Sequence, residues 1–331
     1  MADTTSPGWP RGITQFEQRH GNATMRVVSG ILGIPIVLGA IWLGGWAFFL
    51  LMAIISTGAL LEFYWITEKR GALPNKKLGV IFGLLLALAF MHGVTDRLLL
   101  DIFHVRPDDL AVMLARFTLA FGVLLIFAIA VMIDQMFRKE GSPIINTMAT
   151  LAGVTYISLF LSTLIGLRQL FTSELPFRHY IERFDATLLS RTDRLGALTV
   201  LAIMVAIWTC DSFAYYAGRG FGRHKLFERV SPKKTWEGSV AGAIGGAAAM
   251  IGMQQWFLPY LTVWDAVVIG LIAGVFGQLG DLAESHMKRD AGVKDSSQII
   301  PGHGGIFDRF DSLLFVAPLV YIYLNFIVLT R

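Results

Sequence analysis

Long apolar stretches separated by short polar segments recur along almost the whole of this chain. A helix needs roughly 20 mostly apolar residues to cross the hydrocarbon core of a bilayer. Nine stretches approach that length, and the first two meet at Gly44-Gly45, which predicts a tight helical hairpin. The nine predicted spans are 27–45, 46–66, 78–94, 116–133, 147–167, 196–217, 238–257, 261–280 and 313–330. The expected fold class is therefore an all-α polytopic membrane protein with about nine transmembrane helices.

The composition agrees with this prediction and argues against other classes. Of the 331 residues, 54% are hydrophobic and 16% are charged, whereas soluble domains average about 25% charged residues. The single cysteine, Cys210, has no partner for a disulfide within the chain. The net charge of +4 does not indicate nucleic acid as a partner, because the basic residues lie in short segments between apolar stretches and no nucleic-acid-binding motif accompanies them.

The basic residues predict how the chain is oriented. If residues 1–26 form a cytoplasmic N-terminal arm, every lysine falls on the cytoplasmic side, where membrane proteins concentrate Lys and Arg. The N-terminus is therefore expected in the cytoplasm and, with nine spans, the C-terminus on the other side. In a bacterium the membrane would be the plasma (inner) membrane.

Two polar loops on the predicted cytoplasmic side carry most of the residues that suit catalysis. Each loop follows an apolar span that ends in a carboxylate, and both are dense in acids, bases and glycines. The candidate residues are Asp211, Ser212, Lys233 and Lys234 in the first loop, and Asp281, Lys288, Arg289, Lys294, His303, Gly304, Gly305, Asp308 and Asp311 in the second. A polar active site is expected where these loops meet.

The carboxylates of this group allow two interpretations. Charged groups at the ends of apolar helices are costly and usually functional, and Asp308 and Asp311 share one face if they lie on a helix. Together with Asp281 they would offer the oxygen ligands that Mg²⁺ prefers. The same acids would equally suit structural salt bridges with neighbouring Lys and Arg side chains, and the spacing does not decide between the two.

The lysines and glycines point to phosphate. Lys233 and Lys234 offer positive charge to phosphate oxygens, and the Gly304-Gly305 pair lets backbone N–H groups approach a ligand closely. No G-x-x-x-x-G-K-[ST] motif occurs in the chain. His303 is interpreted as a residue that contacts phosphate or supports its loop, not as a general base. Together these features predict metal-assisted chemistry on a phosphorylated substrate at the membrane surface.

The second loop resembles a known family signature. Residues 285–311, SHMKRDAGVKDSSQIIPGHGGIFDRFD, are similar to the signature of phosphatidate cytidylyltransferases, also called CDP-diacylglycerol synthases. The resemblance extends upstream to about residue 205, and Ser297 stands where the family more often has glycine. It implies transfer of a cytidylyl group from CTP to phosphatidic acid, giving CDP-diacylglycerol and pyrophosphate for phospholipid biosynthesis.

The resemblance also implies roles for individual residues. Asp281, Asp308 and Asp311 are expected to bind Mg²⁺, with a second cation left open, and with Lys294 they form the expected catalytic set. Residues 196–331 are then the catalytic transmembrane region, and residues 27–195 are the N-terminal transmembrane helices and loops. The expected substrate-binding residues are Lys233 and Lys234 for the triphosphate, Lys288, Arg289 and Lys294 for the lipid phosphate or leaving group, and Asp211, Ser212, His303, Gly304 and Gly305 around them.

Three alternatives remain open from the sequence. A cation-coupled transporter would place its acids near the midplane of broken helices, whereas Glu62, Asp211, Asp265 and Asp281 lie near predicted span ends. A cytidylyltransferase acting on another lipid phosphate is a closer rival, because apolar spans that hold acyl chains carry no readable code. The oligomeric state is the third open question. The G-x-x-x-G steps over 238–246 are typical of close helix packing, which could occur inside one bundle or between the two chains of a homodimer.

Overall fold

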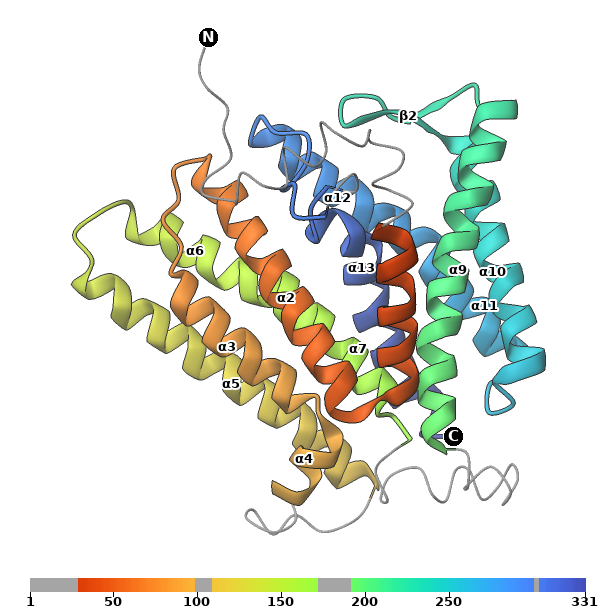
Figure 1. Ribbon diagram of the computed structural model, residues 1–331, viewed down its shortest axis with the longest axis horizontal. Coiled ribbons are helices and arrows are strands. Elements are labelled where there is room, and N and C mark those ends of the chain that lie inside the picture. The colour runs from red at the N-terminus through yellow and green to blue at the C-terminus, as the bar shows by residue number, and fades with distance from the viewer. Residues whose placement is uncertain (1–28, 99–108, 172–191, 301–303) are drawn as a thin grey trace.

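The computed structural model describes residues 29–98, 109–171, 192–300 and 304–331, and helices that pack side by side make up nearly all of them (Figure 1). An apolar helix, Ser29–Leu43, comes first. The α-helices that follow are α2 (Gly45–Glu68), α3 (Lys76–Ala89), α4 (His92–Arg97), α5 (Asp109–Phe137), α6 (Pro143–Gly153), α7 (Phe160–Arg168), α9 (Thr192–Phe221), α10 (Trp236–Phe257), α11 (Val263–Leu271), α12 (Gly277–Asp290) and α13 (Phe307–Tyr323). The predicted arm, 1–26, lies outside the described residues.

Among the described residues, six helices are long and apolar enough to cross a membrane. They are Gly45–Glu68, Leu114–Phe137, Pro143–Arg168, Arg194–Phe221, Val263–Asp290 and Phe307–Val328. The remaining predicted spans are also helical, but Ser29–Leu43 is a shorter apolar helix, α3 has 14 residues, and α10 is not among the six although it has 22. The prediction of a helical membrane protein is confirmed, and the count of nine spans is not.

Three spans contain a π-helical segment. These segments are η2 (Val154–Leu159), η4 (Ile272–Phe276) and η5 (Leu324–Val328), and η2 and η4 join consecutive α-helices without a break. A π-helical turn changes which face of the following helix points inward and is often found at functional sites. In this chain η4 directly precedes α12, the helix that carries Asp281 and Lys288.

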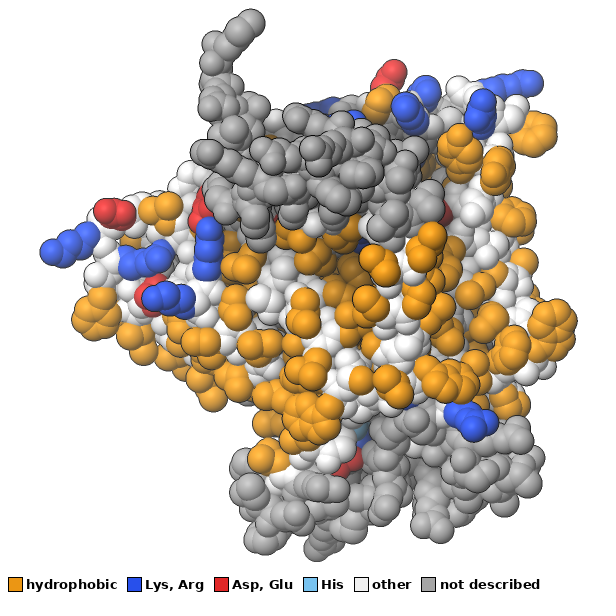
Figure 2. Space-filling view, viewed as in Figure 1, with side chains coloured by type: hydrophobic (Ala, Val, Ile, Leu, Met, Phe, Trp, Pro, Cys, Tyr) orange, Lys and Arg blue, Asp and Glu red, His pale blue; other side chains and the backbone are white. Residues whose placement is uncertain are grey.

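The outside of the bundle is apolar, as a lipid-facing surface requires. Figure 2 shows hydrophobic side chains in a broad belt over the visible face, with most of the visible Lys and Arg side chains above it or to its left. Fully apolar side chains of α5 such as Phe121 and Ile126 are more than half exposed. An apolar exterior of this extent is stable in a bilayer rather than in water. The chain is therefore an integral membrane protein.

The glycine stripe of α10 is used inside the bundle. A Cβ added at Gly238 would lie 2.6 Å from the Ala214 carbonyl oxygen, and one at Gly242 would lie 2.9 Å from that of Cys210, so glycine is needed where α10 crosses α9. Cys210 itself is buried at this contact. The packing of these two helices fixes the end of α9, and with it Asp211, relative to the start of α10.

The end of the bundle away from the polar loops is fixed by Arg168. This side chain is fully buried, and its guanidinium donates hydrogen bonds to the carbonyl oxygens of Ile41 (2.6 Å) and Trp42 (3.1 Å) at the end of the first helix. Gly44, at φ +63°, makes the turn that follows. The predicted hairpin at Gly44-Gly45 is confirmed. Arg168 supplies hydrogen-bond donors to carbonyl groups that the end of a helix leaves without partners.

Candidate active site

The first polar loop folds into a two-stranded hairpin. Strands β1 (Lys225–Phe227) and β2 (Ser231–Thr235) pair antiparallel, with Lys225 opposite Thr235. Thr235 then begins α10, because its side chain accepts a hydrogen bond from the Gly238 amide. This strand pairing turns Lys234 back over the bundle, where its Nζ lies 2.6 Å from Asp281 Oδ2 on α12. The hairpin therefore joins the two polar loops that the sequence predicted to meet.

A cavity of about 600 Å³ lies beneath this hairpin, and we call it the hairpin cavity. Its lining includes the cationic side chains Arg219, Lys225, Lys233 and Lys234, and the acids Asp211 and Asp281. Four cations against two carboxylates give the lining a net positive charge, which suits a polyanion such as a triphosphate. The remaining lining is formed by Ala214, Tyr215, Gly218, Thr235, Gly238, Ser239 and Gln278.

A second cavity, of about 330 Å³, shares Asp211 and Asp281 with the first, and we call it the carboxylate cavity. Asp308 and Asp311 of α13 also line it, next to Ser312 and Arg309. Four carboxylates from three helices thus face one space. The convergence of these acids, which the sequence offered as one interpretation, is what the structure shows.

Within the described residues, one group of acids has the spacing for a metal ion. Asp281, Glu284 and Asp311 each place a carboxylate oxygen within 4.8 Å of the other two. Two oxygens on opposite sides of one Mg²⁺ lie about 4.2 Å apart, so only small side-chain movements separate this arrangement from a shared ion. Glu284 was missed from the sequence. It lies three residues after Asp281 on α12, the same spacing that singled out Asp308 and Asp311.

Asp308 is held by a salt bridge instead. Lys288 Nζ lies 2.7 Å from Asp308 Oδ1 and 2.8 Å from Glu284 Oε1, so the ammonium group joins α12 to α13. Asp308 also accepts hydrogen bonds from the backbone amides of Gly305 (2.8 Å) and Ser296 (3.2 Å). The two interpretations of the carboxylates therefore overlap. Asp281, Glu284 and Asp311 have metal-ligand spacing, but Asp281 also pairs with Lys234, and Glu284 shares Lys288 with Asp308.

Ser212, Arg289, Lys294 and Gly304 are not among the residues that line the two cavities. Ser212 is one residue beyond Asp211, and its hydroxyl donates to the Trp208 carbonyl (2.8 Å) within α9. Arg289 donates to the Val293 carbonyl (3.0 Å), and Lys294 is exposed. Gly304, at φ +83°, forms an isolated bridge with Ile300. His303 lies outside the described residues, and its predicted contact with phosphate stays a prediction.

Glu62 is a second site residue whose role the sequence did not reveal. Its carboxylate on α2 is 3% exposed and accepts four hydrogen bonds from the second loop and the start of α13. The donors are the hydroxyls of Ser296 (2.7 Å) and Ser297 (2.5 Å) and the amides of Ile306 (3.0 Å) and Phe307 (2.8 Å). An acid within an apolar stretch is a signal for such a role.

The two cavities share Asp211 and Asp281 and bring cations and carboxylates together, and comparison with known proteins identifies the family of the chain. Residues 24–327 match the cytidylyltransferase family. A phosphatidate cytidylyltransferase of Synechocystis sp. is 34% identical over 306 residues, which are 90% of this chain and 95% of that protein. The Bacillus subtilis protein of the same name is 32% identical over 89% of this chain and 95% of its own length. This chain therefore belongs to the cytidylyltransferase family.

The region of greatest similarity is shorter. A phosphatidate cytidylyltransferase of Staphylococcus haemolyticus is 46% identical over 129 residues, which are 39% of this chain and 50% of that protein. The family membership rests on the two longer alignments, because those cover almost the whole of both chains.

Proposed function

We propose that this chain is a phosphatidate cytidylyltransferase, which transfers the cytidylyl group of CTP to phosphatidic acid and so supplies CDP-diacylglycerol for phospholipid biosynthesis. The observation that carries the proposal is the pair of adjoining cavities, one lined by cations and the other by carboxylates, in a membrane protein of this family. A bilayer-held phosphate and a soluble triphosphate must meet at the membrane surface, and this pair of cavities lies at the end of the spans.

In this reaction a phosphate oxygen of phosphatidic acid attacks the α-phosphorus of CTP. A new P–O bond forms, the bond between the α-phosphorus and the bridging oxygen breaks, and pyrophosphate leaves with that oxygen. The attacking phosphomonoester has a second pKa of about 6 and is largely a dianion at neutral pH. No side chain has to remove a proton from it, so the protein's tasks are to position the two anions and to neutralise their charge.

The cationic residues of the hairpin cavity are proposed to hold the triphosphate. Lys233 and Lys234 carry this role together with Arg219 and Lys225, which line the same space. Because Asp211 and Asp281 line both cavities, the reacting α-phosphate would lie at their boundary. Lys294 and Arg289, on the second loop, are proposed to approach the lipid phosphate or the leaving pyrophosphate.

Mg²⁺ is proposed to bind between Asp281, Glu284 and Asp311, the three acids with metal-ligand spacing. The chemistry of the site fits a hard cation, because every candidate ligand is a carboxylate oxygen. Without a cation, these carboxylates would repel the phosphate groups of the substrates. A bound Mg²⁺ would neutralise part of that negative charge. Asp308 would reach a second cation only by exchanging its salt bridge with Lys288. Asp211 lines the carboxylate cavity together with Asp281, Asp308 and Asp311.

The lysine-bearing end of the bundle is proposed to face the cytoplasm, where CTP is made, with the N-terminus on the same side. The membrane would be the plasma membrane in a bacterium. A homodimer would have to use a surface other than Gly238 and Gly242, because α9 of the same chain covers them.

The proposal is tested with the purified full-length chain. CTP, phosphatidic acid and Mg²⁺ should give CDP-diacylglycerol and pyrophosphate in equal amounts, and removal of Mg²⁺ with a chelator should stop both. Other lipid phosphates, assayed in parallel with phosphatidic acid, test the alternative that the enzyme transfers the cytidylyl group to a different lipid phosphate. Release of pyrophosphate without a CDP-lipid product, or product only with a different lipid phosphate, would contradict the proposal.

A further inference from the structure

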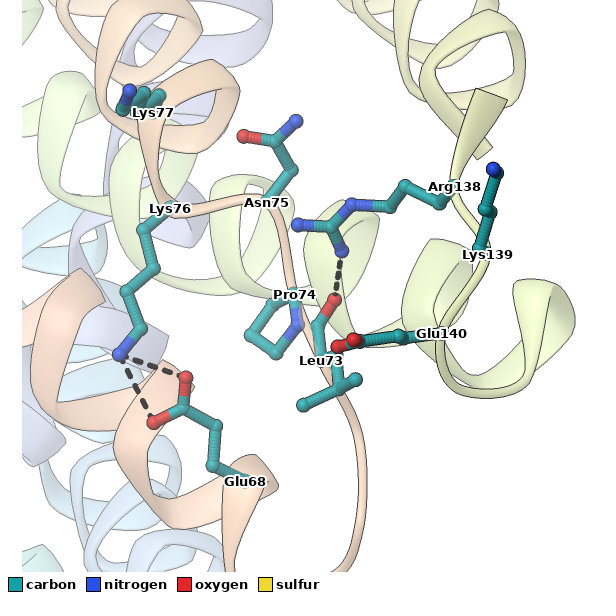
Figure 3. Close-up of a pocket in the computed structure, with 9 residues that line it drawn as sticks. All are labelled: Glu68, Leu73, Pro74, Asn75, Lys76, Lys77, Arg138, Lys139 and Glu140. Carbon is teal, nitrogen blue, oxygen red and sulfur yellow. Dashed lines mark hydrogen bonds and ion pairs between the residues drawn. The ribbon is translucent and has the colours of Figure 1, made fainter. Parts of the chain in front are cut away.

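A separate basic pocket lies outside the two cavities of the candidate active site. It is formed where the connection between α2 and α3 faces the connection between α5 and α6, and its volume is about 690 Å³ (Figure 3). Its lining is Glu68, Leu73, Pro74, Asn75, Lys76, Lys77, Arg138, Lys139 and Glu140. Four cationic side chains against two carboxylates leave it a net charge of +2. The proposed reaction uses none of these residues.

The walls of this basic pocket are fixed by buried side chains. Asn146, fully buried at the start of α6, accepts a hydrogen bond from the Leu73 amide (2.7 Å) and donates one to the Glu140 carbonyl (3.4 Å). Thr150, one turn later, accepts from the Asn75 amide (3.0 Å). Both connections are thereby tied to the same helix, so the pocket between them is part of the fold.

Two of the four cations have an acidic neighbour and two do not. Lys76 pairs with Glu68 (2.7 Å), and Arg138 reaches across the gap to the Leu73 carbonyl, as Figure 3 shows, and lies 3.4 Å from Asp134. Among the described residues, the ammonium groups of Lys77 and Lys139 have no ion-pair or hydrogen-bond partner, and both side chains are exposed. These two ammonium groups are therefore available to an anion.

The surroundings of the pocket identify the source of that anion. Met136 and Phe137, at the end of α5, are 80% and 79% exposed, and Ile144 at the start of α6 is 70% exposed. These exposed apolar side chains flank Arg138, Lys139 and Glu140 of the pocket lining in the sequence, and at the ends of apolar helices such side chains are stabilised by contact with lipid chains. We propose that this basic pocket binds the phosphate headgroup of an anionic membrane phospholipid, whose acyl chains lie against the exposed ends of α5 and α6.

Binding is tested by thermal unfolding of the full-length protein in neutral detergent. Phosphatidylglycerol is the probe, because the proposed reaction does not use it as a substrate. At about ten times its dissociation constant it should raise the melting temperature by roughly 2 to 4 °C. Lys77→Ala/Lys139→Ala should abolish the rise, whereas the charge-matched control Lys77→Arg/Lys139→Arg should retain it.

The other arms distinguish the source of the phosphate. Phosphatidylcholine and inorganic phosphate should each leave the melting temperature unchanged. The proposal is overturned if phosphatidylglycerol fails to stabilise the wild type, or if it stabilises the Ala/Ala variant as much as the wild type. It is also overturned if inorganic phosphate alone gives the same lysine-dependent rise, since the pocket would then bind a free anion.

A second inference concerns Glu62 and rests on the proposed function. The first residues of α13 have no side-chain cap of their own, because the N-cap residue is Ile306. Glu62 of α2 supplies the missing acceptor for the amides of Ile306 and Phe307, and so caps α13 from another helix. It also holds Ser296, whose amide in turn contacts Asp308.

We infer that Glu62 is a positioning residue that sets where α13 presents Asp308 and Asp311. A displacement of about 1 Å at a reacting centre can cost as much as 10²-fold in rate. Glu62→Gln keeps the size of the side chain but puts an NH₂ group where a carboxylate oxygen accepted a hydrogen bond. We expect kcat to fall between about 10-fold and 100-fold, with half-saturation by Mg²⁺ moved to higher concentration.

A matched control comes from the opposite end of the bundle. Asp265 is also a buried carboxylate that caps a helix, since it accepts from the Thr262 amide (2.9 Å) and from Tyr323 (2.7 Å). Asp265→Asn should lower the melting temperature while the activity of the folded protein and its Mg²⁺ dependence stay unchanged. Should Glu62→Gln fail to accumulate, Ser296→Ala removes one of the four donors and should show the same changes at smaller size.

The outcomes separate this inference from the proposed function. If the wild type makes no CDP-diacylglycerol, the proposed function fails. If the wild type is active and Glu62→Gln has the same activity per folded molecule and the same Mg²⁺ dependence, only the positioning role is overturned. The positioning role is also overturned if Glu62→Gln loses only thermal stability, as Asp265→Asn is expected to do.

Discussion

The carboxylate of Glu62 and the backbone amide of Phe307 are 245 positions apart in the sequence and 2.8 Å apart in the structure. This contact ties the N-terminal half of the chain to the helix that carries Asp308 and Asp311. The helices before residue 195 are therefore more than a lipid anchor for the region with the family signature. They hold one side of the candidate active site in place.

Gly305 tests how closely this contact is packed. A Cβ at this position would collide with Ser296 Oγ and Glu62 Oε2. Gly305→Ala must therefore displace both side chains or the backbone itself, and we expect a loss of activity of at least about tenfold when CDP-diacylglycerol formation is measured per folded molecule. Gly220→Ala is the control, because a Cβ there meets nothing within 4 Å. Equal activity of the two variants would contradict the packing argument.

Lys234 tests the assignment of the hairpin cavity to CTP. Its ammonium group lies 2.6 Å from Asp281 and lines the same cavity as Lys233. If the pair holds the triphosphate, Lys234→Ala should raise the KM for CTP more than that for phosphatidic acid, and a single lost charge-assisted contact corresponds to roughly tenfold or more. Steady-state kinetics with each substrate varied in turn provides the measurement. If a double Lys233→Ala/Lys234→Ala variant has an unchanged KM for CTP, these lysines do not bind the triphosphate, and their role is only to set the orientation of the chain in the membrane.

The orientation of the chain can be tested through its lysines. Every lysine lies at the end of the bundle that holds the candidate active site or in the connections at that end, so all should be cytoplasmic. A membrane-impermeant amine reagent should leave them unmodified in intact cells and should modify exposed ones, such as Lys77, Lys139 and Lys294, after permeabilisation. Peptide mass spectrometry reads out each site. Modification of Lys294 from outside would reverse the orientation and separate the site from cytoplasmic CTP.

Gly44 and Gly45 test the hairpin at the other end of the bundle. Both have positive φ, +63° and +46°, but only at Gly44 would a Cβ meet the guanidinium of Arg168. Gly44→Ala should lose more stability than Gly45→Ala for two reasons: the Gly44 backbone (φ +63°, ψ −153°) lies in a region open essentially to glycine, and the added Cβ pushes Arg168 from its carbonyl partners. Thermal unfolding of the two variants should therefore rank Gly44→Ala below Gly45→Ala. Equal melting temperatures would show that the Arg168 contact contributes nothing.

Much of the fold could be predicted because the bilayer imposes a simple pattern. A run of about 20 apolar residues has few alternatives to a helix in lipid, and the turn at Gly44-Gly45 is marked by the residues themselves. Whether a helix crosses fully is harder to predict. α3 has 14 residues where 17 were predicted as a span, and its start at Lys76 is set by the cap from Asn75.

The candidate site could be located but not resolved. Asp281 and Asp311 were predicted to lie close together, and both line the carboxylate cavity. Each lies within the first turns of its helix, Asp281 on α12 and Asp311 on α13. That Glu284, and not Asp308, lies close to both Asp281 and Asp311, and that Lys288 joins Glu284 to Asp308, are relationships between two helices that spacing along one helix does not reveal. Glu62 finds its partners more than 230 positions away, so its place within an apolar stretch marks it as functional but does not show which residues it contacts.

The most direct test of the account is the rate of CDP-diacylglycerol formation by Asp311→Asn, measured together with its folded fraction. The amide keeps the shape of the side chain and removes the charge that would bind Mg²⁺ between Asp281, Glu284 and Asp311. We expect a normally folded protein whose rate is roughly 10²-fold to 10³-fold lower than that of the wild type. Full specific activity in the folded variant, or a loss that follows only the folded fraction, would contradict the metal site at the centre of this account.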